Sequence, residues 1–186
     1  AKENKKVVYI DTENGFSAER LSQLAEGYKE VLSKVVFLRP PDFEGQKKCI
    51  EKLNTLVNDK IGLVVVDTIA MLYRLELKDE GVHNVNRELG RQVSLLTNIA
   101  AKHKLPVLVT NQVYSDFENK GKVNIVGGDL LKYGSKCMIE LQNSTGGVKK
   151  AVLRKHRSLG EEKEALFRII EKGIEPVKEG KGFKLF

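Results

Sequence analysis

The chain has 186 residues, which is enough for one hydrophobic core but too little for two full domains. Hydrophobic residues make up 41% and charged residues 31%, a composition that excludes disordered and fibrous proteins. No window approaches the roughly 18 apolar residues of a membrane span, and no signal peptide is visible. We therefore expect a cytoplasmic protein without a membrane partner.

The first two thirds of the chain alternate short apolar runs with longer segments of helical periodicity. Strands are predicted at 6–11, 35–38, 62–67 and 106–112, with helices that begin near Ser17, after Asp42 and near Asn84. The run Gly62–Asp67 is continuously apolar, as in strands that are buried on both faces of a parallel sheet. The pattern predicts an α/β fold with a mostly parallel central sheet.

The last third of the chain has a different pattern. Residues 114–129 are polar and contain glycine, which predicts a loop. The segments 136–141, 149–153 and 166–170 are predicted to be antiparallel strands joined by tight turns. Because there are no internal repeats or clear linkers, we expect residues 1–186 to form a single domain.

The net charge of +7 is concentrated in the second part of the chain. Residues 1–113 carry 17 basic and 15 acidic groups, whereas residues 114–186 carry 15 and 10. A basic surface there is suited to phosphate. A solubilising surface explains the charge equally well.

Three predicted strands end in polar side chains, at Glu13, Asp67 and Gln112. In a parallel sheet, ligands bind at the carboxyl ends of the strands. An aspartate after four apolar residues is typical of a Walker B strand, whose carboxylate holds a magnesium ion through water beside a nucleotide phosphate. A nearby glutamate can activate the attacking water, and a glutamine can sense the terminal phosphate. Each residue alone is more often a cap or a surface residue, whereas the three together at matching strand ends are more specific.

Three segments together resemble the RecA-family recombinases of archaea and eukaryotes. They are Tyr9–Arg20 (YIDTENGFSAER), Leu63–Thr68 (LVVVDT) and Val107–Val113 (VLVTNQV), in the order and spacing of that family. The basic run Arg154–Arg157 resembles the archaeal RadB branch. The resemblance implies a RecA-like P-loop NTPase core that uses ATP and Mg²⁺. Glu13 and Gln112 would be catalytic, and Asp67 would hold the magnesium ion through water.

The resemblance also implies contacts to DNA and to a neighbouring subunit. The family's DNA-binding loops fall at about 73–84 and 114–128. Candidate contacts to single-stranded or branched DNA are Tyr73, Arg74, Lys78, Tyr114, Phe117, Lys120 and Lys122. Aromatic side chains can stack on the bases of a single DNA strand while basic side chains bind its phosphates. In a homo-oligomer, Lys155, His156 and Arg157 would reach the nucleotide of the neighbouring subunit and stabilise its terminal phosphate. Solvated loops and a solvated strand end are the alternative interpretation.

The implied function is that of an accessory protein in DNA repair and homologous recombination. Such a protein binds DNA and ATP, hydrolyses ATP weakly and performs no strand exchange itself. Its partners would be the RadA recombinase and a Holliday-junction resolvase. Two alternatives stay open: a KaiC-type signalling ATPase with a RecA fold, and a non-catalytic protein-interaction module.

The phosphate-binding P-loop has no match in the sequence. The pattern G-x-x-x-x-G-K-[ST], whose amides, lysine and hydroxyl bind phosphates and magnesium, occurs nowhere in residues 1–186. In the family it lies just upstream of the segment that corresponds to Tyr9–Glu13. We therefore expect an N-terminally truncated core rather than a natural short form. We also expect this chain alone to bind ATP poorly and to hydrolyse none.

Overall fold

The computed structural model describes residues 4–77, 81–115, 123–160 and 163–177. The chain divides into two compact units. The first comprises Ala1–Ala18 and Lys29–Gly134, and the second comprises Glu19–Tyr28 and Ser135–Phe186. The expectation of one domain over residues 1–186 stays a prediction. None of the helices in the described ranges has the length and apolar character that a bilayer span requires.

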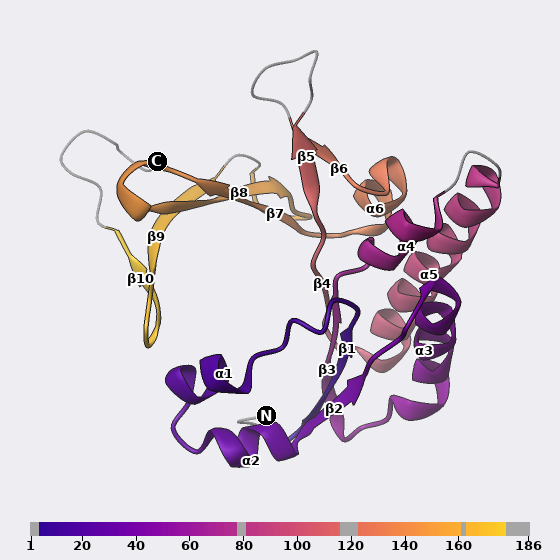
Figure 1. Cartoon of the computed structure of the whole chain (residues 1–186), viewed down its shortest axis with the longest axis horizontal. Coiled ribbons are helices and arrows are strands. Elements are labelled where there is room, and N and C mark those ends of the chain that lie inside the picture. Colours follow the sequence, from indigo (N-terminus) through magenta and orange to yellow (C-terminus); the bar gives the residue numbers. More distant parts are fainter. Residues whose placement is uncertain (1–3, 78–80, 116–122, 161–162, 178–186) are drawn as a thin grey trace. The chain divides into compact units, whose positions relative to one another are not determined.

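A parallel four-stranded sheet forms the centre of the first unit (Figure 1). Its strands are β1 (Lys6–Asp11), β2 (Val35–Leu38), β3 (Ile61–Asp67) and β4 (Val107–Val109), in the order β2-β1-β3-β4. Val64 and Val66 of β3 are fully buried, as the continuous apolar run predicted. The predicted α/β class with a parallel central sheet is confirmed. The predicted strand at 106–112 is shorter in the structure, where β4 ends at Val109 and the side chains of Thr110 and Asn111 bond to Asp67 and Val126.

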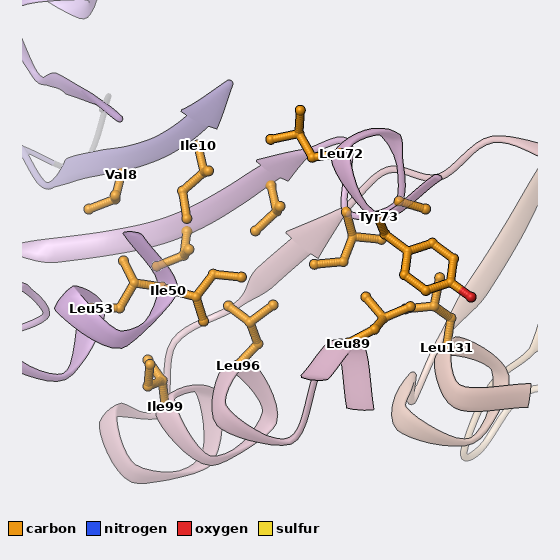
Figure 2. Packing of buried hydrophobic residues seen from close by; sticks show 14 of the residues in the cluster. Val8, Ile10, Ile50, Leu53, Leu72, Tyr73, Leu89, Leu96, Ile99 and Leu131 are labelled. Atoms are coloured by element: carbon orange, nitrogen blue, oxygen red, sulfur yellow. The ribbon is translucent and has the colours of Figure 1, made fainter. Parts of the chain in front are cut away.

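Helices α3 (Phe43–Leu56) and α5 (Val82–His103) pack together beside the sheet (Figure 1). Asp42 caps α3, since its side chain accepts a hydrogen bond from the Gly45 amide at 2.7 Å. Figure 2 shows the core that results, with apolar side chains of both helices facing Val8 and Ile10 of β1. The shorter helices are α1 (Ala18–Leu24), α2 (Tyr28–Ser33), α4 (Met71–Glu76) and α6 (Gly128–Gly134).

Two buried glutamines in this core were not expected from the sequence. The Gln46 amide nitrogen donates to the Ile69 carbonyl at 3.0 Å and to the Gln92 side-chain oxygen at 2.9 Å. Both glutamines are at most 2% exposed. The pair joins α3 and α5 to the backbone just after β3, and so fixes the segment that carries Thr68.

The predicted loop over residues 114–129 is wrong for the residues that the structure describes. Strands β5 (Val113–Ser115) and β6 (Val123–Ile125) pair in antiparallel fashion, and α6 follows them. The Asn111 side chain donates to the Val126 carbonyl at 2.8 Å, and Val126 is only 7% exposed. Gly127 has a φ of +81°, and a Cβ there would lie 3.0 Å from Leu89. Asn111, Val126 and Gly127 therefore attach strands β5 and β6 to the core. The polar composition of the segment does not predict these contacts.

The second unit contains an antiparallel sheet in the order β10-β9-β8-β7. Its strands are β7 (Met138–Asn143), β8 (Lys149–Lys155), β9 (Glu164–Ile170) and β10 (Gly173–Pro176). The predicted antiparallel C-terminal strands are confirmed, and β10 is an additional one. A short 3₁₀ turn, η1 (Thr145–Gly147), joins β7 to β8 where the sequence predicted a tight turn.

Arg20 fastens its helix to the β9–β10 hairpin within the second unit. Its guanidinium donates to the carbonyl oxygens of Glu171 at 2.7 Å and Ile170 at 2.8 Å. A third, longer hydrogen bond reaches the Gly173 carbonyl at 3.4 Å. A planar guanidinium satisfies several carbonyls at once, which an ammonium cannot do with the same geometry.

Replacing Arg20 by methionine is expected to loosen this hairpin. The apolar stem is kept, but the charged donors that cap the turn are lost, at a cost of about 1–3 kcal/mol in local stability. Amide hydrogen exchange in β9 and β10 should accelerate by a similar free energy. Arg91→Met, which removes an exposed guanidinium 3.8 Å from Glu88, is the control. Unchanged exchange in Arg20→Met would contradict the role of Arg20.

Candidate functional site

The carboxyl ends of β1, β3 and β4 meet at one edge of the parallel sheet. We call this edge, which includes Glu13, Asp67, Thr68 and Gln112, the carboxyl edge. Asp11 of β1 lies opposite Asp67 of β3, and Val66 lies opposite Val109 of β4. The hydrogen-bond ladder continues past the strand ends. The Thr12 amide donates to the Asp67 carbonyl at 2.9 Å, and the Ile69 amide donates to the Thr110 carbonyl at 3.1 Å. The segments that follow the three strands are therefore held side by side.

The structure brings Glu13 and Gln112 into direct contact at this edge. The Gln112 amide nitrogen donates to Glu13 Oε1 at 3.1 Å. The same oxygen accepts a hydrogen bond from the Thr68 hydroxyl at 2.9 Å. Gln112 Oε1 in turn accepts a hydrogen bond from the Arg74 guanidinium at 3.1 Å. The predicted glutamate and glutamine thus belong to one chain of hydrogen bonds that runs from Thr68 to Arg74.

Asp67 is held by one hydroxyl group from β1 and one from Thr110, which directly follows β4. The Tyr9 hydroxyl donates to Asp67 Oδ2 at 2.5 Å, and the Thr110 hydroxyl donates to Asp67 Oδ1 at 2.5 Å. Burial raises the pKa of the Tyr9 phenol well above its usual value, and the hydrogen bond to the negatively charged Asp67 carboxylate raises it further. Both hydroxyls lie in the segments that carry the family resemblance, but neither residue was among the predicted site residues.

Two further contacts keep the edge in place. The Thr12 hydroxyl accepts a hydrogen bond from the Thr68 amide and donates one to the Thr68 carbonyl, both at 2.8 Å. Asp11 is 1% exposed, and its carboxylate accepts a hydrogen bond from the Gly15 amide at 3.0 Å. The hydrogen bonds with Thr12 fix Thr68, whose hydroxyl contacts Glu13. The hydrogen bond from Gly15 to Asp11 fixes the turn that follows Glu13.

The carboxylate oxygens at this edge fit a magnesium ion that keeps most of its water ligands, rather than one that is coordinated by protein side chains alone. Magnesium prefers oxygen ligands, keeps several waters and is bound through one or two carboxylates together with substrate phosphates. Asp67 offers a carboxylate held in a fixed orientation. In the described part of the chain, no group of three or more His, Cys, Asp or Glu residues is arranged to hold a metal.

Arg74 and Tyr114 line a pocket of 710 Å³ within the first unit. Tyr73, expected in a loop, instead lies on α4, and so does Arg74. The Tyr73 side chain is only 6% exposed; it packs beside Leu89 and Leu131, as Figure 2 shows. The other residues that line the pocket are Leu77, Asn86, Ile125, Val126, Gly127, Gly128, Asp129, Leu130 and Tyr133. We name it the tyrosine pocket, because Tyr73, Tyr114 and Tyr133 contribute to its wall.

The three tyrosines of this pocket differ in accessibility. Tyr114 is 53% exposed and Tyr133 is 70% exposed. The buried Tyr73 hydroxyl donates to the Asn86 side chain at 2.6 Å, and burial raises the pKa of its phenol. Tyr133 was not among the predicted DNA contacts, because a loop was expected up to residue 129. The remaining predicted contacts, Lys78, Phe117, Lys120 and Lys122, lie outside the described residues.

The basic segment at the end of β8 belongs to the second unit. His156 Nδ1 accepts hydrogen bonds from the backbone amides of Ser158 at 3.1 Å and Leu159 at 3.0 Å. The imidazole therefore shapes the turn after the strand. Lys155 is half-buried, and Arg157 is exposed. Their contact with a neighbouring subunit stays a prediction.

A parallel sheet with these polar strand ends, accompanied by an antiparallel C-terminal sheet, defines a RecA-like α/β protein. Residues 2–177 match the model of the Rad51 family. The chain belongs to the Rad51 family.

Relatives and a solved structure place the chain near one branch of that family. It is 38% identical over 181 residues to "DNA repair and recombination protein RadB" of Methanobrevibacter smithii, covering 94% of this chain and 76% of the relative. It is 44% identical over 173 residues to the protein of the same name from Methanocaldococcus jannaschii, covering 91% and 79%. A crystal structure of the RadB recombinase superimposes with a TM-score of 0.79 at 38% identity, covering 95% of this chain and 81% of that one. The resemblance to the RadB branch is confirmed.

Replacing Tyr9 by phenylalanine is expected to reduce the loss of stability at alkaline pH. The pKa of Tyr9 is raised in the folded chain, so its stabilising contribution is complete below the unfolded value of about 10 and is lost as the pH rises above it. Urea unfolding at about pH 8 and about pH 10.5 should show a larger decrease for the wild type than for Tyr9→Phe. Tyr28→Phe, outside the site, should keep the wild-type decrease. Equal decreases in the wild type and Tyr9→Phe would contradict the raised pKa of Tyr9.

Proposed function

We propose that this protein acts in DNA repair and homologous recombination by binding single-stranded or branched DNA at the tyrosine pocket and Mg–ATP at the carboxyl edge. Relatives at 38% and 44% identity are named DNA repair and recombination proteins. The observation that carries the proposal is the hydrogen-bonded chain Thr68–Glu13–Gln112–Arg74. It connects the carboxyl edge to the tyrosine pocket. Membership of the Rad51 family favours this role over a KaiC-type signalling ATPase.

At the carboxyl edge, each side chain has a role that suits its position. Glu13, exposed at the end of its turn, orients and deprotonates the water that attacks the terminal phosphate. Asp67 holds a hydrated magnesium ion, which offsets the charge on the phosphate oxygens when bound. Gln112 contacts the terminal phosphate. Lys155, His156 and Arg157 act on the nucleotide of the adjacent subunit in a homo-oligomer, where positive charge favours phosphoryl transfer. Hydrolysis is weak and depends on a phosphate-binding P-loop, which residues 1–186 do not contain. The protein performs no strand exchange of its own.

At the tyrosine pocket, the exposed Tyr114 ring stacks on a base while the Arg74 guanidinium binds a phosphate. Base stacking on an aromatic ring contributes about 1–3 kcal/mol and tolerates any sequence. Arg74 offers a bidentate donor set for phosphate oxygens. The buried Tyr73 supports the wall, and the basic residues Lys78, Lys120 and Lys122, with Phe117, extend the contact. RadA and a Holliday-junction resolvase are the proposed protein partners.

Replacing Tyr114 by leucine is expected to weaken binding to a short single-stranded oligonucleotide. Loss of one stacking contact predicts a decrease of about 5- to 150-fold in affinity. Fluorescence anisotropy with a labelled oligothymidylate measures it on the 186-residue chain. Tyr28→Leu, which removes a ring elsewhere, is the matched control and should bind like the wild type.

The same titrations at two salt concentrations test the electrostatic part of the proposal. Contacts to phosphate release counterions, so affinity should fall steeply as salt increases. The proposal fails if the affinity is the same at low and high salt, or if Tyr114→Leu and Tyr28→Leu bind equally well.

A further inference from the structure

We infer that the opposite edge of the parallel sheet, where its four strands begin, binds the phosphate backbone of duplex DNA. We call it the amino edge. A lysine lies at or just before the start of every strand there: Lys5 and Lys6 at β1, Lys34 at β2, Lys60 at β3 and Lys104 at β4. None of these lysines belongs to the carboxyl edge or to the tyrosine pocket. The amino edge is therefore a second nucleic-acid surface, and it does not depend on the proposed function.

Backbone hydrogen bonds hold the strand starts together, so these lysines form a row. The Val7 amide donates to the Lys34 carbonyl at 3.0 Å, and the Lys6 amide donates to the Lys60 carbonyl at 2.8 Å. The strand order β2-β1-β3-β4 places Lys104 at the end of the row. Because neighbouring strands lie about 4.8 Å apart, the row spans roughly 15 Å of the sheet.

Lys5 and Lys104 also line one pocket of 480 Å³ at this edge. Both residues are exposed, and the ion pairs between described side chains involve neither of them. Asp59 is the one carboxylate among the described residues that line this pocket. Two ammonium groups therefore face one acid, which suits an anionic occupant.

The backbone at two positions allows this placement of the lysines. A Cβ at Gly62 would lie 2.9 Å from Lys5 Cβ and 3.0 Å from Lys5 Cδ, so the glycine lets the lysine stem lie across β3. Lys104 follows α5 with a φ of +50°, a conformation that glycine adopts more easily at the end of a helix. Strained positions of this kind are concentrated at functional sites. The helix dipole also favours a cation there, so the test must separate binding from stability.

The chemistry of the amino edge fits a duplex better than a single strand or a protein. No Phe, Tyr or Trp is among the described residues that line the pocket, so unpaired bases have no ring on which to stack. In a duplex the bases are paired, and ammonium groups bind the phosphates without reading the sequence. Protein interfaces are depleted in lysine and enriched in aromatic residues. Glu30, which pairs with Lys34 at 2.8 Å, and Asp59 reduce the positive charge of the row without reversing it.

Fluorescence anisotropy of the 186-residue chain with a short, labelled, blunt-ended duplex tests the amino edge. Lys5→Gln and Lys104→Gly should each lower the affinity about tenfold near 0.1 M salt and reduce the dependence of log affinity on log salt by about 1. Lys48→Gln, which removes an exposed charge from α3, is the matched control and should bind nearly like the wild type. Because glycine suits the left-handed backbone, Lys104→Gly should keep a free energy of unfolding in urea close to that of the wild type.

The outcomes separate this inference from the proposed function. Tyr114→Leu should leave the affinity for the duplex unchanged, and both lysine variants should bind oligothymidylate like the wild type. A wild-type chain that binds no duplex overturns the inference, and so does Lys5→Gln or Lys104→Gly that binds the duplex as tightly as Lys48→Gln. Equal losses of affinity for oligothymidylate and duplex also overturn it. Each of these results leaves the stacking role of Tyr114 to its own test.

Discussion

The parallel register of β1, β3 and β4 determines where the candidate site residues of the first unit lie. Asp11 is level with Asp67, and Val66 is level with Val109, so three chain segments leave the sheet together. A slip of one residue would exchange the two faces of a strand, and the fully buried Val8 and Ile10, which share one face of β1, oppose it. The contacts of Asp67 with the Tyr9 and Thr110 hydroxyls depend on this register, because Tyr9 lies on β1 and Thr110 directly follows β4.

The carboxyl edge contains buried hydrogen bonds around Asp67 and Thr68 and exposed hydrogen bonds around Gln112. The Thr12–Thr68 hydrogen bonds are buried, and the acceptor Asp67 is bound from both sides. The hydrogen bonds of Gln112 to Glu13 and Arg74 are exposed, where water competes for every donor and acceptor. A site that must hold an ion and also respond to a ligand needs both kinds of contact. The fixed contacts surround Asp67, the proposed magnesium ligand, and the exposed contacts surround Glu13, the proposed water-activating residue.

Much of this arrangement could be predicted from the sequence, because polar residues that follow apolar runs mark strand ends. Glu13, Asp67 and Gln112 were identified in that way, and the structure places them on one sheet edge. The hydroxyl partners were not identified, since their contacts depend on side-chain rotamers and on register rather than on local pattern. Strands β5 and β6 could not be predicted, because strands of three residues carry too little periodicity. Gln46 was missed because its hydrogen bonds come from distant segments.

A double-mutant cycle between Asp67 and Thr110 tests the convergence of the strand ends most directly. The free energy of unfolding is measured for Asp67→Ala, for Thr110→Val and for the double variant. Because the two side chains share a charged hydrogen bond at 2.5 Å, we predict a coupling energy of about 1–3 kcal/mol. Thr55→Val, at an exposed position of α3, should show no coupling with Asp67→Ala. Effects of Asp67→Ala and Thr110→Val that add to within about 0.5 kcal/mol would contradict the proposed edge.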